Sequence, residues 1–191
     1  MIITGLDLSL TGSGVATVHT TAAGRVIAVE EYGTKPTLHD LESRSIRLRK
    51  VAAPIICACE FSDVVAIEDL FMGQGTGAQL DRAGLWWIVV NSLCASGIPV
   101  VAITNNHLKM WCLGKGGGQG TDKTHILAAT IKRYPDVNIT SDNVADALNL
   151  AAMAAHFYGH PTVPMPATNL RALAGVKMWP NLPNHPIERN A

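Results

Sequence analysis

The chain opens with Met1-Ile-Ile-Thr-Gly-Leu-Asp-Leu-Ser-Leu10, an apolar run that holds one carboxylate, Asp7, and leads into the glycine-rich turn Thr11-Gly-Ser-Gly14. The run predicts a β-strand at the start of the fold. An ionised carboxylate is costly to bury unless a cation or hydrogen-bond donors meet it. Asp7 is therefore either a metal ligand that projects into a cleft or a turn residue at the end of a strand. Acids elsewhere in the chain decide between the two.

Length and composition indicate one compact domain. The chain has 191 residues, of which 48% are hydrophobic and 16% are charged, and this composition excludes a disordered chain. Its formal charge is zero, so nucleic acid would have to bind through a local patch. No signal peptide and no membrane-spanning run is recognisable, and the four cysteines lack zinc-site spacing. We expect a soluble, reduced protein of the cytoplasm, or of the host cytoplasm if the protein is viral.

The spacing of apolar residues predicts an α/β fold in which three antiparallel strands precede alternating helices and strands. The expected strands cover residues 1–10, 14–19, 25–32, 64–68 and 99–103. The expected helices cover residues 37–60, 78–96, 107–113, 122–134 and 141–156. Prolines recur from Gly159 onward, so we expect residues 159–191 to form an extended or partly disordered arm outside a domain of residues 1–158. Trp179 in this arm is a candidate contact to a partner or to DNA.

Further acids at the ends of expected strands and helices are candidates for a site shared with Asp7. Glu68 ends the fourth expected strand, and Asp69 should point to the opposite side because side chains alternate along a strand. If that strand lies beside the first, Asp7 and Glu68 can share a cation. Asp146 lies one turn inside the last helix among apolar neighbours, which again favours a partner cation. Asp142, near the start of that helix, needs no function beyond capping.

Two glycine-rich loops carry candidate DNA contacts. The first follows Glu68 and presents Phe71 and Met72, which are either a plug for the core or a wedge for stacked bases. The second, residues 114–123, contains Lys115 and Lys123. Its backbone N–H groups and lysines suit a nucleic-acid backbone, although a disordered linker would have a similar composition.

The order of these elements is that of a ribonuclease-H-like nuclease, and four short motifs resemble the RuvC family of Holliday-junction resolvases, especially its divergent viral members. The motifs are Gly5-Leu-Asp-Leu-Ser9, Ala66-Ile-Glu-Asp-Leu-Phe-Met72, Gly114-Lys-Gly through Asp122-Lys123, and Asn143-Val-Ala-Asp-Ala-Leu148. The resemblance implies a five-stranded mixed sheet, with three antiparallel strands and then two parallel strands, flanked by helices.

The resemblance also implies a metal site. Asp7, Glu68 and Asp146 match the metal-binding acids of the family. The family's fourth position, an acid or a histidine, is Asn143 in this chain. An amide is a poorer Mg²⁺ ligand than a carboxylate, so either the neighbouring Asp142 replaces it or the second ion is held more weakly by Asn143. We expect Asp142 to take this place.

DNA contacts and assembly follow from the same resemblance. Phe71 matches a residue that inserts at the junction centre, which favours a wedge role for Phe71 and the adjacent Met72. Lys115 and Lys123 match basic positions near the DNA backbone. A homodimer is implied, and we expect the helix that carries Trp86 and Trp87 to form the dimer face.

The implied activity is metal-dependent nicking of four-way DNA junctions. Two Mg²⁺ ions per active site, replaceable by Mn²⁺, would support phosphodiester hydrolysis without a general-base histidine. Two alternatives remain open at this point. One is a branched-DNA-binding module that lacks metal chemistry, for which Asn143 is the supporting feature. The other is a fragment of an actin-like phosphotransferase, whose phosphate-binding turn is similar to the turn after Asp7.

Overall fold

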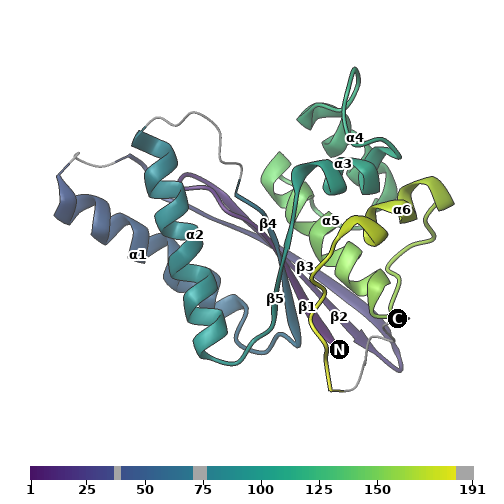
Figure 1. Cartoon of the computed structure of the whole chain (residues 1–191), viewed down its shortest axis with the longest axis horizontal. Helices are drawn as coiled ribbons and strands as arrows, with labels where there is room; N and C mark the ends of the chain where they lie inside the picture. The colour runs from purple at the N-terminus through teal and green to yellow at the C-terminus, as the bar shows by residue number, and fades with distance from the viewer. Residues whose placement is uncertain (37–39, 71–76, 184–191) are drawn as a thin grey trace.

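The computed structural model describes residues 1–36, 40–70 and 77–183, and within them a five-stranded sheet separates two groups of helices (Figure 1). The strands are β1 (Ile2–Asp7), β2 (Ser13–Thr21), β3 (Gly24–Tyr32), β4 (Val64–Glu68) and β5 (Val100–Ile103). Their order across the sheet is β3-β2-β1-β4-β5. Strands β1, β2 and β3 pair antiparallel, whereas β4 runs parallel to both β1 and β5. The predicted mixed sheet is confirmed.

The five predicted helices are all present, with small shifts at their ends. The helices are α1 (Leu41–Ala58), α2 (Gly77–Ala95), α3 (Asn105–Leu113), α4 (Lys123–Arg133), α5 (Asp142–Phe157) and α6 (Ala167–Gly175). Polar caps define four of the starts, because each cap side chain accepts a hydrogen bond from the backbone N–H three residues later. These caps are Asp40, Thr104, Asp122 and Ser141. None of the described helices has the length and apolar character that crossing a bilayer requires.

Alternation of side chains along β1 directs its two faces to different helices. Leu6 and Leu8 belong to one core cluster, together with the buried residues of α1 and α2. Ile3 belongs to the other, which contains most of α5. Helices α1 and α2 lie on one side of the sheet in Figure 1, and α3 to α6 lie on the other. Asp7 is an even number of residues from Ile3, so it faces the α5 side.

Glycines allow α5 to lie unusually close to β1 and β2. A Cβ atom on Gly5 would overlap the backbone carbonyl of Ala147, and one on Gly14 would overlap the carbonyl of Asn143. The helix contributes to this closeness, since half of its buried positions are alanine. The close contact brings the helix that carries Asp146 onto the strand that carries Asp7.

The expectation of irregular structure after Gly159 is wrong for residues 167–175. Helix α6 forms there and packs against α3. Pro166 takes the N-cap position of α6, where a proline is tolerated, and no proline interrupts the helix. Further on, Trp179 is buried and stacks on Phe157, with the ring centroids 4.1 Å apart. Trp179 is therefore a core residue, not a surface contact for a partner or DNA.

Replacing Trp179 by alanine should lower the free energy of unfolding by about 3 kcal/mol, because the change leaves a cavity beside Phe157 and Tyr158. Urea unfolding measures this difference. Met178→Ala is the matched control, since Met178 is 81% exposed and its truncation should change stability by less than about 0.5 kcal/mol. Equal effects of the two changes would show that this segment does not pack on the domain in solution.

Gly5→Ala should destabilise the protein by about 2 kcal/mol or more, because its methyl group has no space against the Ala147 backbone. Thermal unfolding is the readout. Gly117→Ala provides the control, since a Cβ atom there meets nothing within 4 Å. A Gly5→Ala protein as stable as the control variant would contradict the close helix–strand contact.

Candidate active site

Asp7 and Glu68 end two neighbouring parallel strands. The register pairs Leu6 of β1 with Ile67 of β4, so the residues that follow lie at the same level. Asp7 is 2% exposed, and the side chain of Glu68 is 11% exposed. Asp69 is exposed, in agreement with the alternation predicted for this strand. The carboxyl ends of parallel strands are where open α/β sheets bind their ligands.

Asp146 of α5 is buried near this pair, and one of its two carboxylate oxygens has no hydrogen-bond partner among the described residues. It is 2% exposed, and its Oδ1 atom accepts no hydrogen bond from the part of the chain that the structure describes. Buried carboxylate oxygens are normally paired with donors or cations, because desolvation is costly. Asp146 is therefore the group at this edge that most needs a ligand.

Burial and mutual proximity raise the pKa values of two of these carboxyl groups, Asp7 and Asp146. Burial, followed by the charge of Glu68 and a hydrogen bond with it, raises the pKa of Asp7 well above its usual value. Burial and then the charge of Glu68 raise the pKa of Asp146 to about 7, and Lys123 partly opposes this shift. A bound cation would reverse both shifts, since it favours the ionised form.

Glu68 is held by residues from two helices. Nη2 of Arg82 on α2 lies 3.5 Å from Oε2 of Glu68 and 3.9 Å from Oδ1 of Asp7. Asn105, the first residue of α3, donates its side-chain amide to Oε1 of Glu68 at 2.8 Å. Trp86 donates its indole N–H to the backbone carbonyl of Glu68 at 3.0 Å. Trp86 thereby fixes the strand end and Asn105 fixes the carboxylate, whereas the contact of Arg82 is longer.

Arg82, Asn105 and Trp86 were not among the predicted site residues. The sequence held a signal for Arg82, because the helix over residues 77–95 contains only two charged residues, Asp81 and Arg82. Charged residues in an otherwise apolar helix usually have a partner of opposite charge, and this helix follows a strand that ends in Glu68. Asn105 carried no comparable signal, since an asparagine just before an expected helix needs no partner beyond its own backbone.

Asp142 and Asn143 begin α5 and have different partners. Asp142 is half exposed, and its Oδ2 accepts a hydrogen bond from Nζ of Lys123 at 2.7 Å. This hydrogen bond lowers the pKa of Asp142. Asn143 instead donates its side-chain amide to the backbone carbonyl of Gly12, in the turn after β1. Asn143 thus ties α5 to that turn, while Asp142 remains an ionised carboxylate beside a lysine.

The two predicted DNA-contacting lysines differ in their surroundings. Burial opposes protonation of Lys123, but the hydrogen bond to Asp142 and the charge of Asp7 outweigh it and raise the pKa of Lys123. Lys115 is exposed and donates to the carbonyl of Gln119 within the glycine-rich loop at 2.6 Å. Phe71 and Met72 lie outside the described residues.

The donor types at this edge suit a hard divalent cation, which prefers carboxylate oxygens. The unpartnered oxygen of Asp146 and the raised pKa of Asp7 are consistent with such an ion. Across residues 1–36, 40–70 and 77–183, however, no three Asp, Glu, His or Cys side chains form a group that could hold a metal ion. In the described arrangement Glu68 is bound to Arg82 and Asn105, so its carboxylate would have to exchange partners to become a ligand.

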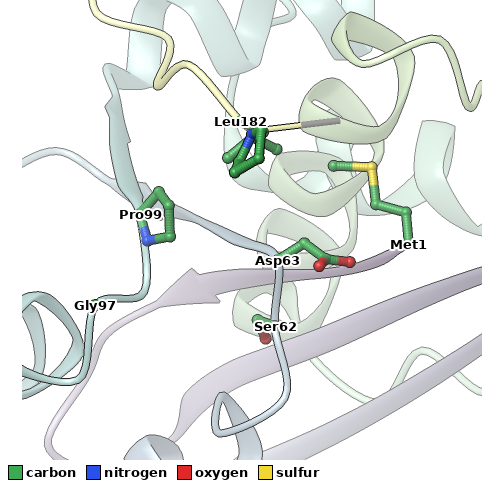
Figure 2. A pocket seen from close by; sticks show the side chains of 7 residues that line it. Met1, Ser62, Asp63, Gly97, Pro99 and Leu182 are labelled. Atoms are coloured by element: carbon green, nitrogen blue, oxygen red, sulfur yellow. The ribbon is translucent and has the colours of Figure 1, made fainter. Parts of the chain in front are cut away.

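A cavity of about 480 Å³ lies at the opposite edge of the sheet (Figure 2). Its lining residues are Met1, Ser62, Asp63, Gly97, Pro99, Leu182 and Pro183. Most of them immediately precede β1, β4 or β5, so the cavity lies at the amino ends of the parallel strands. No predicted site residue lines it, and the carboxylates are a separate site.

Comparison with solved structures identifies the fold. RuvC of Thermus thermophilus is similar over 79% of this chain and 91% of its own, with 19% identity and a TM-score of 0.62. The same protein in complex with a Holliday junction substrate gives a TM-score of 0.63 at 20% identity, over 79% of this chain and 90% of its own. The Holliday junction resolvase of fowlpox virus gives a TM-score of 0.55 at 15% identity, over 82% of this chain and 99% of its own. No protein-family model matches the sequence, and no curated protein matches it. The chain therefore has the ribonuclease-H-like fold of RuvC-type resolvases, as the sequence motifs predict.

The metal-free protein should be less stable at pH 8 than at pH 5. The pKa of Asp146 rises on folding from 3.8 to about 7, so the folded state binds a proton more tightly than the unfolded chain does. Stability consequently falls as pH increases through this interval. Asp146→Asn cannot ionise and should exceed the wild type at pH 8 in EDTA, by an amount on the order of 2 kcal/mol.

Urea unfolding in EDTA at the two pH values measures this effect. Asp136→Asn is the control, because Asp136 is exposed and its substitution should leave the pH dependence of stability unchanged. Identical pH dependence in wild type and Asp146→Asn would contradict a raised pKa of Asp146 in the folded protein.

Proposed function

We propose that this protein is a metal-dependent endonuclease that nicks branched DNA, with the four-way junction as its main substrate. The observation that carries the proposal is the burial of Asp7 and Asp146 at the carboxyl edge of a sheet with the RuvC fold, where their charge is incompletely balanced. The solved structures compared above are of RuvC and of a Holliday junction resolvase, and one RuvC structure contains a Holliday junction substrate.

Asp7, Glu68 and Asp146 would hold Mg²⁺, with Asp142 completing the set and Mn²⁺ able to substitute. Two such ions, when bound, supply an activated water and stabilise the leaving oxygen of the phosphodiester. The chain's own contribution is to hold Asp7 and Asp146 in a buried place, where their interaction with charge is strong. Lys123, beside Asp142, is positioned to offer an ammonium group to a DNA phosphate.

The net charge of zero means that DNA binding must rely on local groups. We assign this role to Lys115, Lys123 and the backbone N–H groups of the loop between α3 and α4. Phe71 and Met72 are proposed as the apolar contacts to the junction centre, on the family resemblance alone.

A homodimer would place two active sites on the two strands to be cut. Trp87 is 61% exposed and Leu80 is 68% exposed, and they lie on one side of α2, two turns apart. Trp86 has its indole N–H bound to Glu68, so Trp87 is the half of this pair that is free to face a second copy. We propose this side of α2 as the dimer face.

A branched-DNA-binding module without metal chemistry is the second candidate. Asn143 uses its amide to hold Gly12, and no group of three metal ligands is formed in the described part of the chain. Such a module would bind junctions but would be indifferent to the loss of Asp7.

Cleavage of a labelled immobile four-way junction, compared with linear duplex, distinguishes these candidates. We expect paired nicks near the crossover with Mg²⁺ or Mn²⁺ and none in EDTA. Asp7→Asn should lower the cleavage rate by more than about 100-fold while junction binding persists, because loss of a group that merely supports a metal ligand already costs about 10- to 100-fold. Asp69→Asn is the control, because Asp69 lies directly after β4 and is exposed, so this variant should retain full activity.

Tight junction binding without cleavage under either metal would instead favour the binding module. A protein that neither binds nor cuts junctions would contradict both candidates, and nucleotide binding would then be the next property to measure.

A further inference from the structure

Arg82 reaches the carboxyl ends of β1 and β4 from α2. Its Nε donates to the backbone carbonyl of Leu8 at 3.1 Å, and its Nη2 lies between the carboxylates of Asp7 and Glu68. Within the described chain, Arg82 is the one cationic side chain that forms an ion pair with either of these acids. The guanidinium thus partly balances the charge that a metal ion would balance.

The pairing of Arg82 with these carboxylates is loose. Its nearest carboxylate oxygens are 3.5 and 3.9 Å from Nη2, beyond the usual 2.7–3.2 Å of an N–H···O hydrogen bond. Arg44 provides the comparison, because both its Nε and its Nη2 donate to Asp81, with Nε 3.1 Å from Oδ1. The side chain of Arg82 is 47% exposed, whereas that of Arg44 is 26% exposed. Arg82 can therefore leave the carboxylates for solvent at small cost.

A guanidinium and a divalent ion repel each other strongly if both contact the same buried carboxylates. We propose that Arg82 is an internal counter-ion, which neutralises Asp7 and Glu68 in the metal-free protein, competes with the metal for them and moves away when the metal binds. Arg82 is in this sense a positioning residue, since it acts through the two acids. The inference rests on the proposed metal site.

Mn²⁺ binding to the full chain, measured by calorimetry at pH 7.5, tests the competition. Arg82→Gln should bind Mn²⁺ about 10-fold more tightly than the wild type, because a competing unit charge has been removed. The same variant should have a lower Tm in EDTA, where the carboxylates lose their counter-charge. Arg82→Lys keeps the charge and should remain close to the wild type in both measurements. Arg49→Gln is the matched control, because Arg49 is exposed on α1 and its loss should change neither quantity.

Unchanged or weaker Mn²⁺ binding by Arg82→Gln would overturn the inference. Should that variant fail to fold, the wild type offers an independent measurement, the Nε–H resonance of Arg82 during a Mg²⁺ titration, assigned by its absence in Arg82→Lys. We expect this resonance to shift as the side chain leaves the site, and a fixed resonance at saturating Mg²⁺ would overturn the proposal.

The controls separate this inference from the proposed function. If Mn²⁺ binding is lost in Asp7→Asn but unaltered in Arg82→Gln, the proposed metal site is supported and only the role of Arg82 is contradicted. A wild type that binds no Mn²⁺ would remove both.

Discussion

Burial of several carboxyl groups at one edge of a sheet is the constraint on which the described structure depends. Asp7 and Asp146 are each 2% exposed, so neither obtains its solvation from bulk water. The surrounding elements are arranged to make this possible. Gly5 and Gly14 let α5 approach the strands, while α2 and α3 supply Arg82 and Asn105 to Glu68. A looser contact between helix and strand would admit water and remove the free-energy cost of burying these negative charges.

This cost of buried negative charge can be lowered in three ways. A proton can stay on Asp7 or Asp146, as the raised pKa of each carboxyl group indicates. A side-chain cation can approach, as Arg82 and Lys123 do in the described arrangement. A divalent ion can bind, which supplies the most charge in the smallest volume. These three solutions exclude one another in part, so pH, the two basic side chains and metal concentration act on a single equilibrium.

Local periodicity was sufficient to predict the five strands and helices α1 to α5. The pairing of Asp7 with Glu68 depended on the further condition that the fourth strand lies beside the first, and the register shows that it does. Alternation of side chains at the end of β4 explains why Asp69 lies outside the site. The segment after Gly159 was predicted wrongly because its structure comes from distant contacts, such as that of Trp179 with Phe157, which the prolines do not reveal. Asn105 and Trp86 were missed for the same reason, since their roles depend on which strand end lies beside them. The placing of Arg82 also needed the tertiary structure, although its isolation in an apolar helix was visible.

Position 143 is where this chain departs from the family pattern, and the structure supplies a physical reason for the amide. The side-chain amide of Asn143 donates to the carbonyl of Gly12, and Gly14 lies directly beneath the carbonyl of Asn143 itself. An aspartate here would set a carboxylate oxygen against the Gly12 carbonyl, two acceptors with no proton between them. The carboxylate would then have to turn away, which breaks the link between α5 and the turn after β1, or it would have to carry a proton. Asp142, which is half exposed and accepts a hydrogen bond from Lys123, has no such constraint. A fourth ligand from this helix start is therefore expected from Asp142 rather than from residue 143.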